Sequence, residues 1–291
     1  MNAIIFGCNG QDGKILSDLL IDKKIKVVGV ARSESKFKGD ISNYNFVKKI
    51  IKLYKPDYIF HFAANSTTNH SALFDNHSAI STGTFNLLES VKLFSPNSKV
   101  FLSGSAMQFK NKNLPINEKT PFEASSPYSV SRTQSTFAGR YFRNVFGLKI
   151  YTGFLFNHDS IYRSDRHINM KILKSALQIS KGSLNKLEVG DILVKKEFNF
   201  AGDIVNAIWR LINQDEIFEA VIGSGKSYKI KDWIKICFKN NNLNWEKYIV
   251  QNSNYLSEYK NLVSDPKLIK SIGWNPETDI NQLYYKMKNQ L

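Results

Sequence analysis

The chain has 291 residues, enough to bury a substantial core as one large domain or as a domain with an appended lobe. Its composition, 42% hydrophobic and 22% charged, excludes a largely disordered chain. The formal net charge of +15 arises from lysines spread along the whole sequence among many asparagines, which indicates a compositional bias rather than a nucleic-acid interface and still suits an anionic substrate.

No apolar run approaches the length of a membrane span, and residues 1–7 lead directly into a strand pattern rather than a signal peptide. Cys8 and Cys237 form no CxxC pair, so neither a disulfide framework nor a zinc site is indicated. We therefore expect a cytoplasmic enzyme that binds no metal, membrane or nucleic acid.

The first expected elements form a dinucleotide-binding pattern. Residues 3–6 are a short apolar run typical of a buried strand, and Gly7, Gly10 and Gly13 follow before a helix with one apolar face. Such glycines permit a tight turn and let the backbone approach a pyrophosphate at the helix N-terminus. The strand, loop and helix together, rather than the glycine triplet alone, predict a dinucleotide site.

The second expected strand, residues 26–31, ends without the acidic residue that would bind the ribose 2′-hydroxyl of NAD. Arg32 and Ser33 follow it instead, and a cation beside a hydroxyl suits the 2′-phosphate of NADP. The alternative is a solvated loop arginine. We expect NADP(H) as the cofactor.

A third strand, residues 58–62, leads into Ala63 and Ala64, whose small side chains would let a cofactor lie close over the strand end. His61 alternates with apolar neighbours and is therefore expected to be a packed core histidine rather than a ligand.

A helix with an apolar face at residues 83–89 and a strand at residues 98–103 come next, and Ser105 follows that strand. Strands alternate with helical segments through residue 155. This alternation predicts an α/β fold with a doubly wound parallel sheet of the Rossmann type.

Residues 125–132 then place a tyrosine beside a cation. Ser126 suits a helix N-cap and Pro127 the first helical position, so Tyr128 and Arg132 lie on one helical face. A fixed cation stabilises a phenolate, which makes the tyrosine a candidate proton donor or acceptor for a carbonyl and alcohol pair. On these residues alone, a surface tyrosine near a cation is the simpler interpretation.

Together these motifs resemble the extended short-chain dehydrogenases/reductases that act on nucleotide sugars, and more narrowly the GDP-mannose 4,6-dehydratase and GDP-4-keto-6-deoxymannose reductase group. The matching residues span most of the chain: the glycine loop with Gln11 and Asp12, Gly39, Asp40, Ile41, Phe62, Ala63, Ala64, Ser105, Tyr128, residues 155–160, Arg163, Lys171, Ile172, Lys196, Glu197, Gly273 and Trp274.

The resemblance implies a cofactor-binding Rossmann domain at residues 1–157, with segments near 198–223 returning to it. Residues 158–291 would mainly form a smaller C-terminal lobe that binds the nucleotide sugar. It also implies a homodimer that pairs through helices including the one with Tyr128.

The resemblance further implies roles for individual residues. Ser105 would bind the sugar C4 oxygen, Tyr128 would be the acid/base, and Arg132 would complete the catalytic set. The implied cofactor contacts are Gly7, Asn9, Gly10, Gln11, Asp12, Gly13, Arg32, Asp40, Ile41, Phe62, Ala63, Ala64, Tyr128, Arg132, His158 and Arg163. The implied nucleotide-sugar contacts are Ser105, Met107, Asn157, Lys171 and Lys196.

The chain also departs from the group. Met107 stands where the dehydratases have the carboxylate that removes the C5 proton, so we expect no 4,6-dehydration unless the loop is misaligned. Arg132 stands in place of a lysine. Arginine keeps the positive charge but is not deprotonated, so we expect reduced redox activity. Lys196 replaces an arginine, and a second phosphate-binding arginine has no match at residues 254–258.

The expected function is NADP(H)-dependent reduction of a nucleotide-linked 4-keto-6-deoxy sugar, hexose or heptose, in the synthesis of a surface polysaccharide such as lipopolysaccharide or capsule. GDP is the expected nucleotide. The alternatives are a nucleotide-sugar 4-epimerase or 4-dehydrogenase with a tightly held cofactor, and a catalytically weak paralogue that partners a dehydratase.

Overall fold

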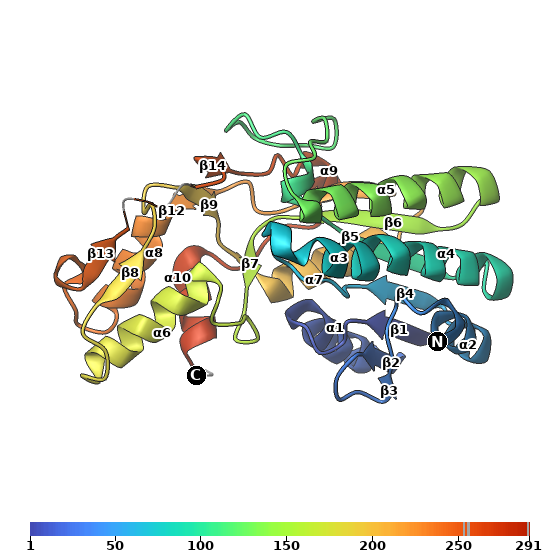
Figure 1. The fold of residues 1–291 in the computed structure, drawn as a ribbon, viewed down its shortest axis with the longest axis horizontal. Helices are drawn as coiled ribbons and strands as arrows, with labels where there is room; N and C mark the ends of the chain where they lie inside the picture. Colours follow the sequence, from blue (N-terminus) through green and yellow to red (C-terminus); the bar gives the residue numbers. More distant parts are fainter. Residues whose placement is uncertain (253, 255–256, 290) are drawn as a thin grey trace.

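A parallel seven-stranded sheet forms the centre of the larger part of the molecule in the computed structural model, which describes residues 1–252, 254, 257–289 and 291 (Figure 1). The strand order is β11–β6–β5–β4–β1–β2–β3. The strands are β1 (Asn2–Phe6), β2 (Lys26–Ala31), β3 (Phe37–Lys38), β4 (Tyr58–His61), β5 (Lys99–Ser105), β6 (Ile150–Leu155) and β11 (Glu219–Ile222).

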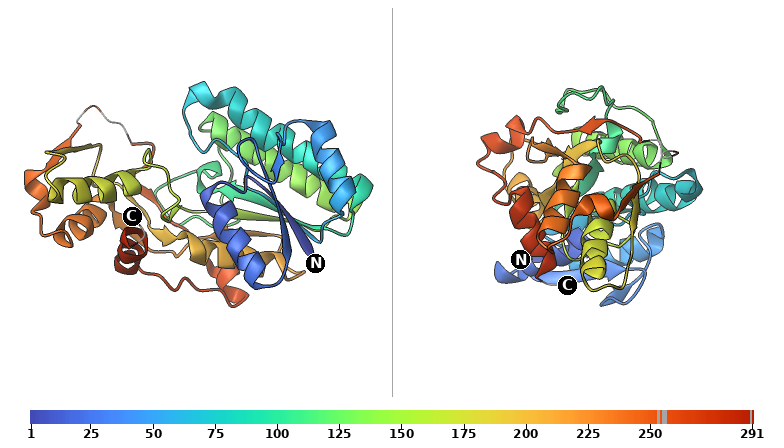
Figure 2. Two further views of the ribbon diagram at one scale, coloured as in Figure 1. Left: turned by 90° about the horizontal axis from the view of Figure 1, so that it is seen from below. Right: turned by 90° about the vertical axis from the view of Figure 1, so that its left-hand side faces the viewer.

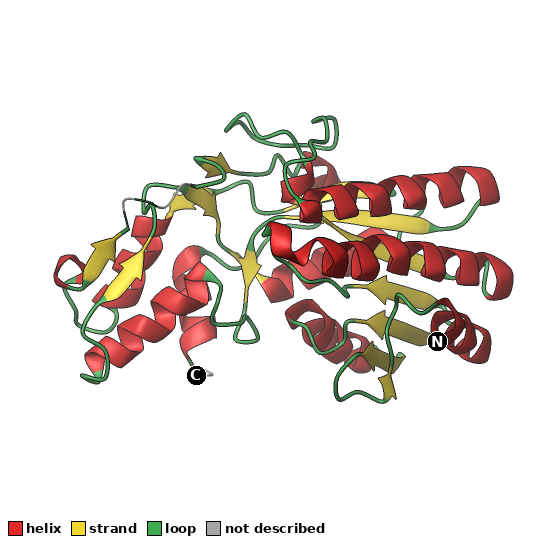
Figure 3. Ribbon diagram, viewed as in Figure 1, coloured by secondary structure: helices red, strands yellow, loops and turns green. Residues whose placement is uncertain are grey.

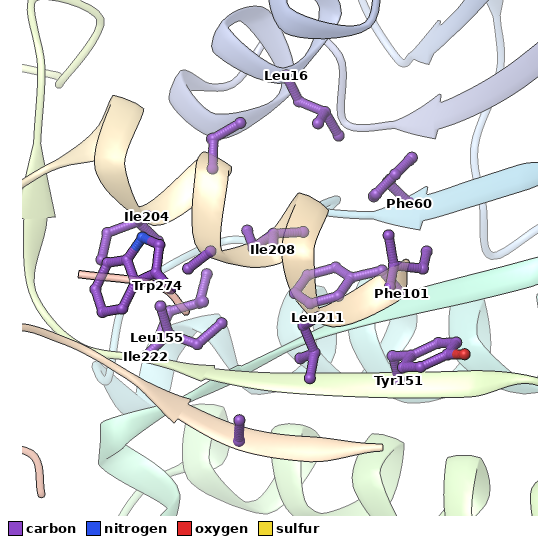
Figure 4. Packing of buried hydrophobic residues seen from close by; sticks show 14 of the residues in the cluster. Leu16, Phe60, Phe101, Tyr151, Leu155, Ile204, Ile208, Leu211, Ile222 and Trp274 are labelled. Atoms are coloured by element: carbon purple, nitrogen blue, oxygen red, sulfur yellow. The ribbon is translucent and has the colours of Figure 1, made fainter. Parts of the chain in front are cut away.

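Helices cover both faces of this sheet. One face packs against α1 (Gln11–Asp22) and α7 (Ala201–Ile212), and Figure 4 shows their side chains lying over those of the strands. The other face packs against α2 (Tyr44–Tyr54), α4 (Gly83–Phe94) and α5 (Pro127–Phe146). Apolar strands buried on both faces are typical of a doubly wound sheet, so the predicted fold class is confirmed.

Several short helical elements complete the structure. They are the helices α3 (Leu73–Asn76) and α9 (Lys267–Ser271), the 3₁₀ turns at His70–Ala72, Ala106–Gln108 and Trp245–Lys247, and a π-helical turn at His77–Thr82 that leads into α4. His61 is 1% exposed at the end of β4, which confirms the expected core histidine.

The smaller lobe lies at one end of the sheet (Figures 2 and 3). Its helices are α6 (Ile168–Ser180), α8 (Ile230–Lys239) and α10 (Ile280–Lys288). They share an apolar core with β8 (Leu187–Val189), which pairs with β13 (Ile249–Gln251). A second small sheet joins β12 (Ser227–Lys229), β9 (Lys195–Glu197) and β14 (Asn261–Leu262).

The chain crosses between the two parts several times. After β6 it forms β7 (His158–Asp159), builds α6 and β9 in the lobe, and returns through β10 (Asn199–Phe200), which pairs with β7. It then runs through α7 to β11, which pairs with β6 in the main sheet. Among the described residues, no helix is both long and apolar enough to cross a membrane.

Candidate active site

The glycine loop between β1 and α1 forms a close-fitting cradle. Gly7 has φ +87°, and a Cβ there would lie 2.7 Å from the backbone nitrogen of Ala63. A Cβ at Gly13 would collide with the backbone of the same loop. α1 begins at Gln11, and its N-cap Gly10 offers no side-chain acceptor, so the first N–H groups of the helix are left for an anion. The loop therefore fits a pyrophosphate.

A hollow of about 170 Å³ beside this loop gathers the residues expected at the adenosine end of the cofactor. Asn9 Nδ2 donates to Ser33 Oγ at 2.9 Å and to the carbonyl oxygen of Glu34 at 2.7 Å, which holds the loop after β2 against the glycine loop. Arg32 is exposed at the rim. The walls include Gly7, Asn9, Gly10, Arg32, Ser33, Asp40, Ile41, Ala63 and Ala64.

A cavity of about 350 Å³ lies over the carboxyl ends of β5 and β6, where ligands bind in such sheets. It begins at the glycine loop, and Gly10 and Ala64 line both hollows. It brings together candidate residues that are far apart in sequence: Gly10, Gln11, Asp12, Gly13, Phe62, Ala64, Ser105, Met107, Tyr128, Arg132, Asn157, His158 and Arg163.

Tyr128 enters this cavity because α5 starts where the sequence predicts. Ser126 is the N-cap, its Oγ accepts from the backbone N–H of Ser129 at 3.1 Å, and Pro127 is the first helical residue. The predicted cap is therefore confirmed. The guanidinium carbon of Arg132 lies 5.2 Å from the centre of the Tyr128 ring, so the two side chains share one face of the helix.

Ser105 ends β5 and caps the following 3₁₀ turn. Its Oγ accepts from the backbone N–H of Met107 at 3.2 Å, which leaves its own O–H to donate to a ligand. Its backbone N–H donates to Gln108 Oε1 at 2.7 Å, and Gln108 Nε2 donates to Thr136 Oγ1 on α5 at 3.0 Å. These bonds fix Ser105 relative to the helix that carries Tyr128.

Arg132 is 5% exposed and is anchored at the end of β5. Its Nη1 donates to the carbonyl oxygen of Ser103 and, at 2.7 Å, to Ser103 Oγ. Burial, and then the Arg132 cation, lower the pKa of His61 to about 3, so His61 is neutral at working pH. Arg132 is thus the fixed positive charge beside Tyr128.

A second cavity of about 520 Å³ adjoins the first on the side of the small lobe. Glu258 and Tyr259 line both cavities. Lys196 is 6% exposed in this wall, and burial lowers its pKa to about 8; the Asp159 carboxylate opposes this shift and the Arg163 cation adds to it. Lys171 lies here too, and its Nζ donates to the carbonyl oxygen of Glu188 at 2.9 Å.

Comparison with known families settles the wider relationship. The family model described as GDP-mannose 4,6 dehydratase matches residues 4–287. The chain belongs to this family. The family consists of extended short-chain dehydrogenases/reductases that modify nucleotide sugars with NAD(P).

Individual family members are distant in sequence but similar over the whole chain. GDP-mannose 4,6 dehydratase 1 of Arabidopsis thaliana is 28% identical over 99% of this chain and 89% of its own length. GDP-mannose 4,6-dehydratase of Vibrio cholerae is 25% identical over 98% of this chain and 92% of its own.

Solved structures show the same fold. RMD from Pseudomonas aeruginosa, solved with NADPH, superposes with a TM-score of 0.88 at 21% identity, covering 99% of this chain and 97% of that one. UDP-glucose 4-epimerase from Thermotoga maritima, solved with UDP-glucose, gives a TM-score of 0.89 at 18% identity, covering 100% and 98%. At these identities the likeness concerns the fold alone.

Several of the cofactor contacts implied by the family resemblance also pair with other protein groups in this chain. His158 Nδ1 lies 2.7 Å from the carbonyl oxygen of Phe156, and its Nε2 lies 3.0 Å from Asp12 Oδ1. Although burial opposes both charges, this pairing raises the pKa of His158 and lowers that of Asp12. Arg163 Nε lies 3.2 Å from Asp159 Oδ1. His158 therefore ties β7 to the first turn of α1.

Sequence analysis missed several residues of the two cavities. Ser103, which anchors Arg132, had no motif of its own. Glu258 reaches the cavity of Ser105 and Tyr128 from the small lobe, and its Oε1 accepts from Thr68 Oγ1 at 2.5 Å. Nothing local in the sequence marks these residues, because their partners lie in other elements. Residues 255 and 256, within the region searched for a second arginine, lie outside the described residues.

Proposed function

We propose that the chain is an NADP(H)-dependent 4-ketoreductase of a nucleotide-linked 4-keto-6-deoxy sugar, hexose or heptose, in the synthesis of lipopolysaccharide, capsule or a related surface polysaccharide. GDP is the proposed nucleotide. One observation carries the proposal: Met107 presents a thioether to the cavity that contains Ser105 and Tyr128, so this position offers no base for elimination. A cavity with an acid/base and a hydroxyl donor is suited to plain reduction.

The chain's residues fit the cofactor. The glycine loop would hold the pyrophosphate, Arg32 with Ser33 the 2′-phosphate, and Asp40 with Ile41 the adenine. We assign this unit to residues 1–157 with the returning segments near 198–223, and the nucleotide sugar mainly to residues 158–291. Bound NADPH would supply a hydride from C4 of its nicotinamide ring.

The protein side of the reaction falls to Tyr128 and Ser105. The Ser105 O–H would donate to the sugar C4 oxygen, because the Ser105 oxygen already accepts from the backbone N–H of Met107 and its proton is left free. Tyr128 would hold the proton that passes from its Oη to this oxygen as the carbonyl becomes an alcohol. Arg132 would keep positive charge beside the developing phenolate.

Cationic side chains in the two cavities support binding of a diphosphate, although carboxylates line the same cavities. Arg163 lines the catalytic cavity, and Arg166 and Lys196 line the adjoining one. The sugar would lie near Ser105, Met107 and Asn157, while Lys171 and Lys196 would face the nucleotide. The net charge of +15 also favours an anionic substrate.

The proposal is tested with purified protein, NADPH and GDP-4-keto-6-deoxymannose. NADPH absorbance should fall, and Tyr128→Phe should lower kcat by about 10²-fold or more. Exchangeable cofactor distinguishes this reductase from an epimerase or dehydrogenase that retains it. No NADPH consumption with any GDP-, CDP- or dTDP-linked 4-keto sugar would refute the proposal and favour a catalytically weak paralogue.

A 4,6-dehydratase is the second candidate, and Glu258 is the observation that favours it. Its carboxylate lines the cavity that also contains Ser105, Met107 and Tyr128, although it comes from a different element. If Glu258 replaces the base absent at Met107, the protein should convert GDP-mannose to a 4-keto-6-deoxy product without consuming added NADPH. Glu258→Gln should then abolish that product and spare reduction of a supplied 4-keto sugar.

A further inference from the structure

Among the described residues, Ser103 is the anchor of the fixed cation in the catalytic cavity. Arg132 Nη1 donates to both the carbonyl oxygen and the Oγ of Ser103, the latter at 2.7 Å. Ser103 is itself 5% exposed, and its Oγ donates to the carbonyl oxygen of His61 on β4 at 2.9 Å. One serine hydroxyl therefore links β4 and β5 to the guanidinium on α5.

No carboxylate in the described part of the chain pairs with the Arg132 guanidinium. Among the described residues Arg132 forms no ion pair, and its buried Nε has no hydrogen-bond partner. The nearby His61 is neutral, because burial and Arg132 lower its pKa to about 3. A buried cation without a counter-charge is costly unless it is hydrogen-bonded. The direction of the guanidinium therefore depends on the two acceptors of Ser103.

We propose that Ser103 is a positioning residue that fixes the guanidinium of Arg132 beside Tyr128. The Ser103 hydroxyl would thus allow an arginine to serve as the cation beside Tyr128. The inference rests on the proposed function, in which Arg132 and Tyr128 serve reduction of a keto sugar. Removing the Ser103 hydroxyl leaves only the backbone acceptor, so the planar guanidinium is free to turn about its Cδ–Nε bond.

The role should be specific to arginine. A lysine ammonium ends one bond nearer the helix than the Nη atoms of arginine, and it lacks the planar fork that two acceptors can orient. Loss of the Ser103 hydroxyl should therefore matter with arginine at position 132 and not with lysine. A double-mutant cycle measures this dependence.

The first test needs no substrate. In ¹⁵N NMR spectra of the unliganded protein, the Nη1–H protons of Arg132 should exchange with water about tenfold faster or more in Ser103→Ala, because the hydrogen bond from Nη1 to the Ser103 hydroxyl is lost. Ser103→Thr keeps the hydroxyl and should retain slow exchange. Thr152→Val is the matched control: Thr152 is 2% exposed on the next strand, and its Oγ1 has no partner among the described residues. It should leave Arg132 unchanged.

The second test uses reduction of GDP-4-keto-6-deoxymannose. Ser103→Ala should lower kcat about tenfold with little change in KM, whereas it should have no effect in an Arg132→Lys background. Unchanged exchange of Arg132 in Ser103→Ala, or an equal loss of kcat in both backgrounds, overturns the proposal. If exchange accelerates as expected but the wild type reduces no keto sugar, the positioning stands and the proposed function is wrong.

Discussion

The Lys196 side chain is almost fully buried in the cavity wall, and burial lowers its pKa to about 8. A diphosphate binds only the ammonium form, so affinity for GDP should be full below that pH and fall as the pH rises through it. Stability should change in the opposite direction: the buried charge destabilises the folded chain fully below about pH 8, and this cost disappears, so that stability rises, as the pH approaches the unfolded pKa of about 10.4.

This dependence is measured by calorimetric titration with GDP from about pH 6.5 to about pH 9.5. Lys196→Arg should bind GDP with almost constant affinity, because arginine stays charged over the whole range. An equal decline in both proteins would show that Lys196 does not contact the diphosphate.

Met107 decides the proposed reaction class. Met107→Glu would place a carboxylate two residues after Ser105, at the cost of charging a position that packs against an apolar cluster. We expect reduction of the 4-keto sugar to fall and a trace of 4-keto-6-deoxy product to appear from GDP-mannose. Mass spectrometry of the nucleotide sugars detects it. Met107→Gln is the matched control, and product from that variant too would contradict the assigned role.

For individual residues, prediction from sequence succeeded where neighbouring residues in the chain decide the structure. Ser126 and Pro127 specify the start of α5 because a cap is decided within one turn. The anchor of Arg132 could not be predicted, because Ser103 lies 29 residues earlier on a different element. Glu258 and Thr68 are separated by 190 residues and meet only through the packing of the small lobe.

At the scale of elements, α5 carries an apolar stripe on its outer side. Val130, Phe137, Tyr141 and Val145 recur at intervals of four or seven residues and are 37%, 54%, 52% and 58% exposed. Phe85 on α4 is 49% exposed as well. A helix face of this kind pairs well with a second copy, which supports the proposed homodimer.

The stripe gives a direct test of assembly. Phe137→Asp should convert a dimer to a monomer in light scattering at micromolar concentration, because a buried unpaired charge opposes association. Leu53→Asp changes a residue that is 64% exposed on α2 and should leave the mass unchanged. A monomeric wild type would contradict the proposed homodimer.

Glu197 ties the small lobe to the main sheet. Its carboxylate is fully buried and accepts from the backbone N–H of Ser224 at 2.6 Å, of Gly225 at 3.2 Å and of Ser264 at 2.6 Å, and from Asn199 Nδ2 at 2.9 Å. These donors come from the loop after β11, the segment after β14, and β10. One carboxylate therefore holds β9 in place beside the cavity that Lys196 lines.

Glu197→Gln should lower the free energy of unfolding by about 2–4 kcal/mol, because an amide nitrogen cannot accept from the clustered N–H groups. Glu216→Gln alters an exposed carboxylate and should change stability by less than about 0.5 kcal/mol. Urea denaturation followed by circular dichroism measures both. Equal stability of the two variants would mean that these bonds contribute little.

At the scale of the whole molecule, sequence pattern predicted the parallel sheet well. Most strands of the main sheet are largely apolar runs separated by helices, whereas the two-residue β3 follows β2 with no helix between them. The small lobe could not be predicted in this way. Strands as short as β9 and β14 have no pattern of their own, and their pairing is decided by tertiary contacts such as those of Glu197.

The two adjoining cavities also depend on tertiary contacts between segments far apart in the sequence. The glycine loop, the end of β5 and α5 come from the first half of the chain, and β7 and the small lobe close the opposite wall. Family resemblance supplied the roles of many of these residues, whereas the contacts between the halves came only from the structure.

The most direct test of the account is the fate of the hydride. Protein incubated with GDP-4-keto-6-deoxymannose and NADPH deuterated at C4 of the nicotinamide should yield a GDP-6-deoxy sugar with one deuterium at C4, detected by NMR and mass spectrometry. Unlabelled GDP-mannose should remain unchanged in the same buffer. A keto sugar that gains no deuterium, together with conversion of GDP-mannose to a 4-keto-6-deoxy product, would contradict the central claim.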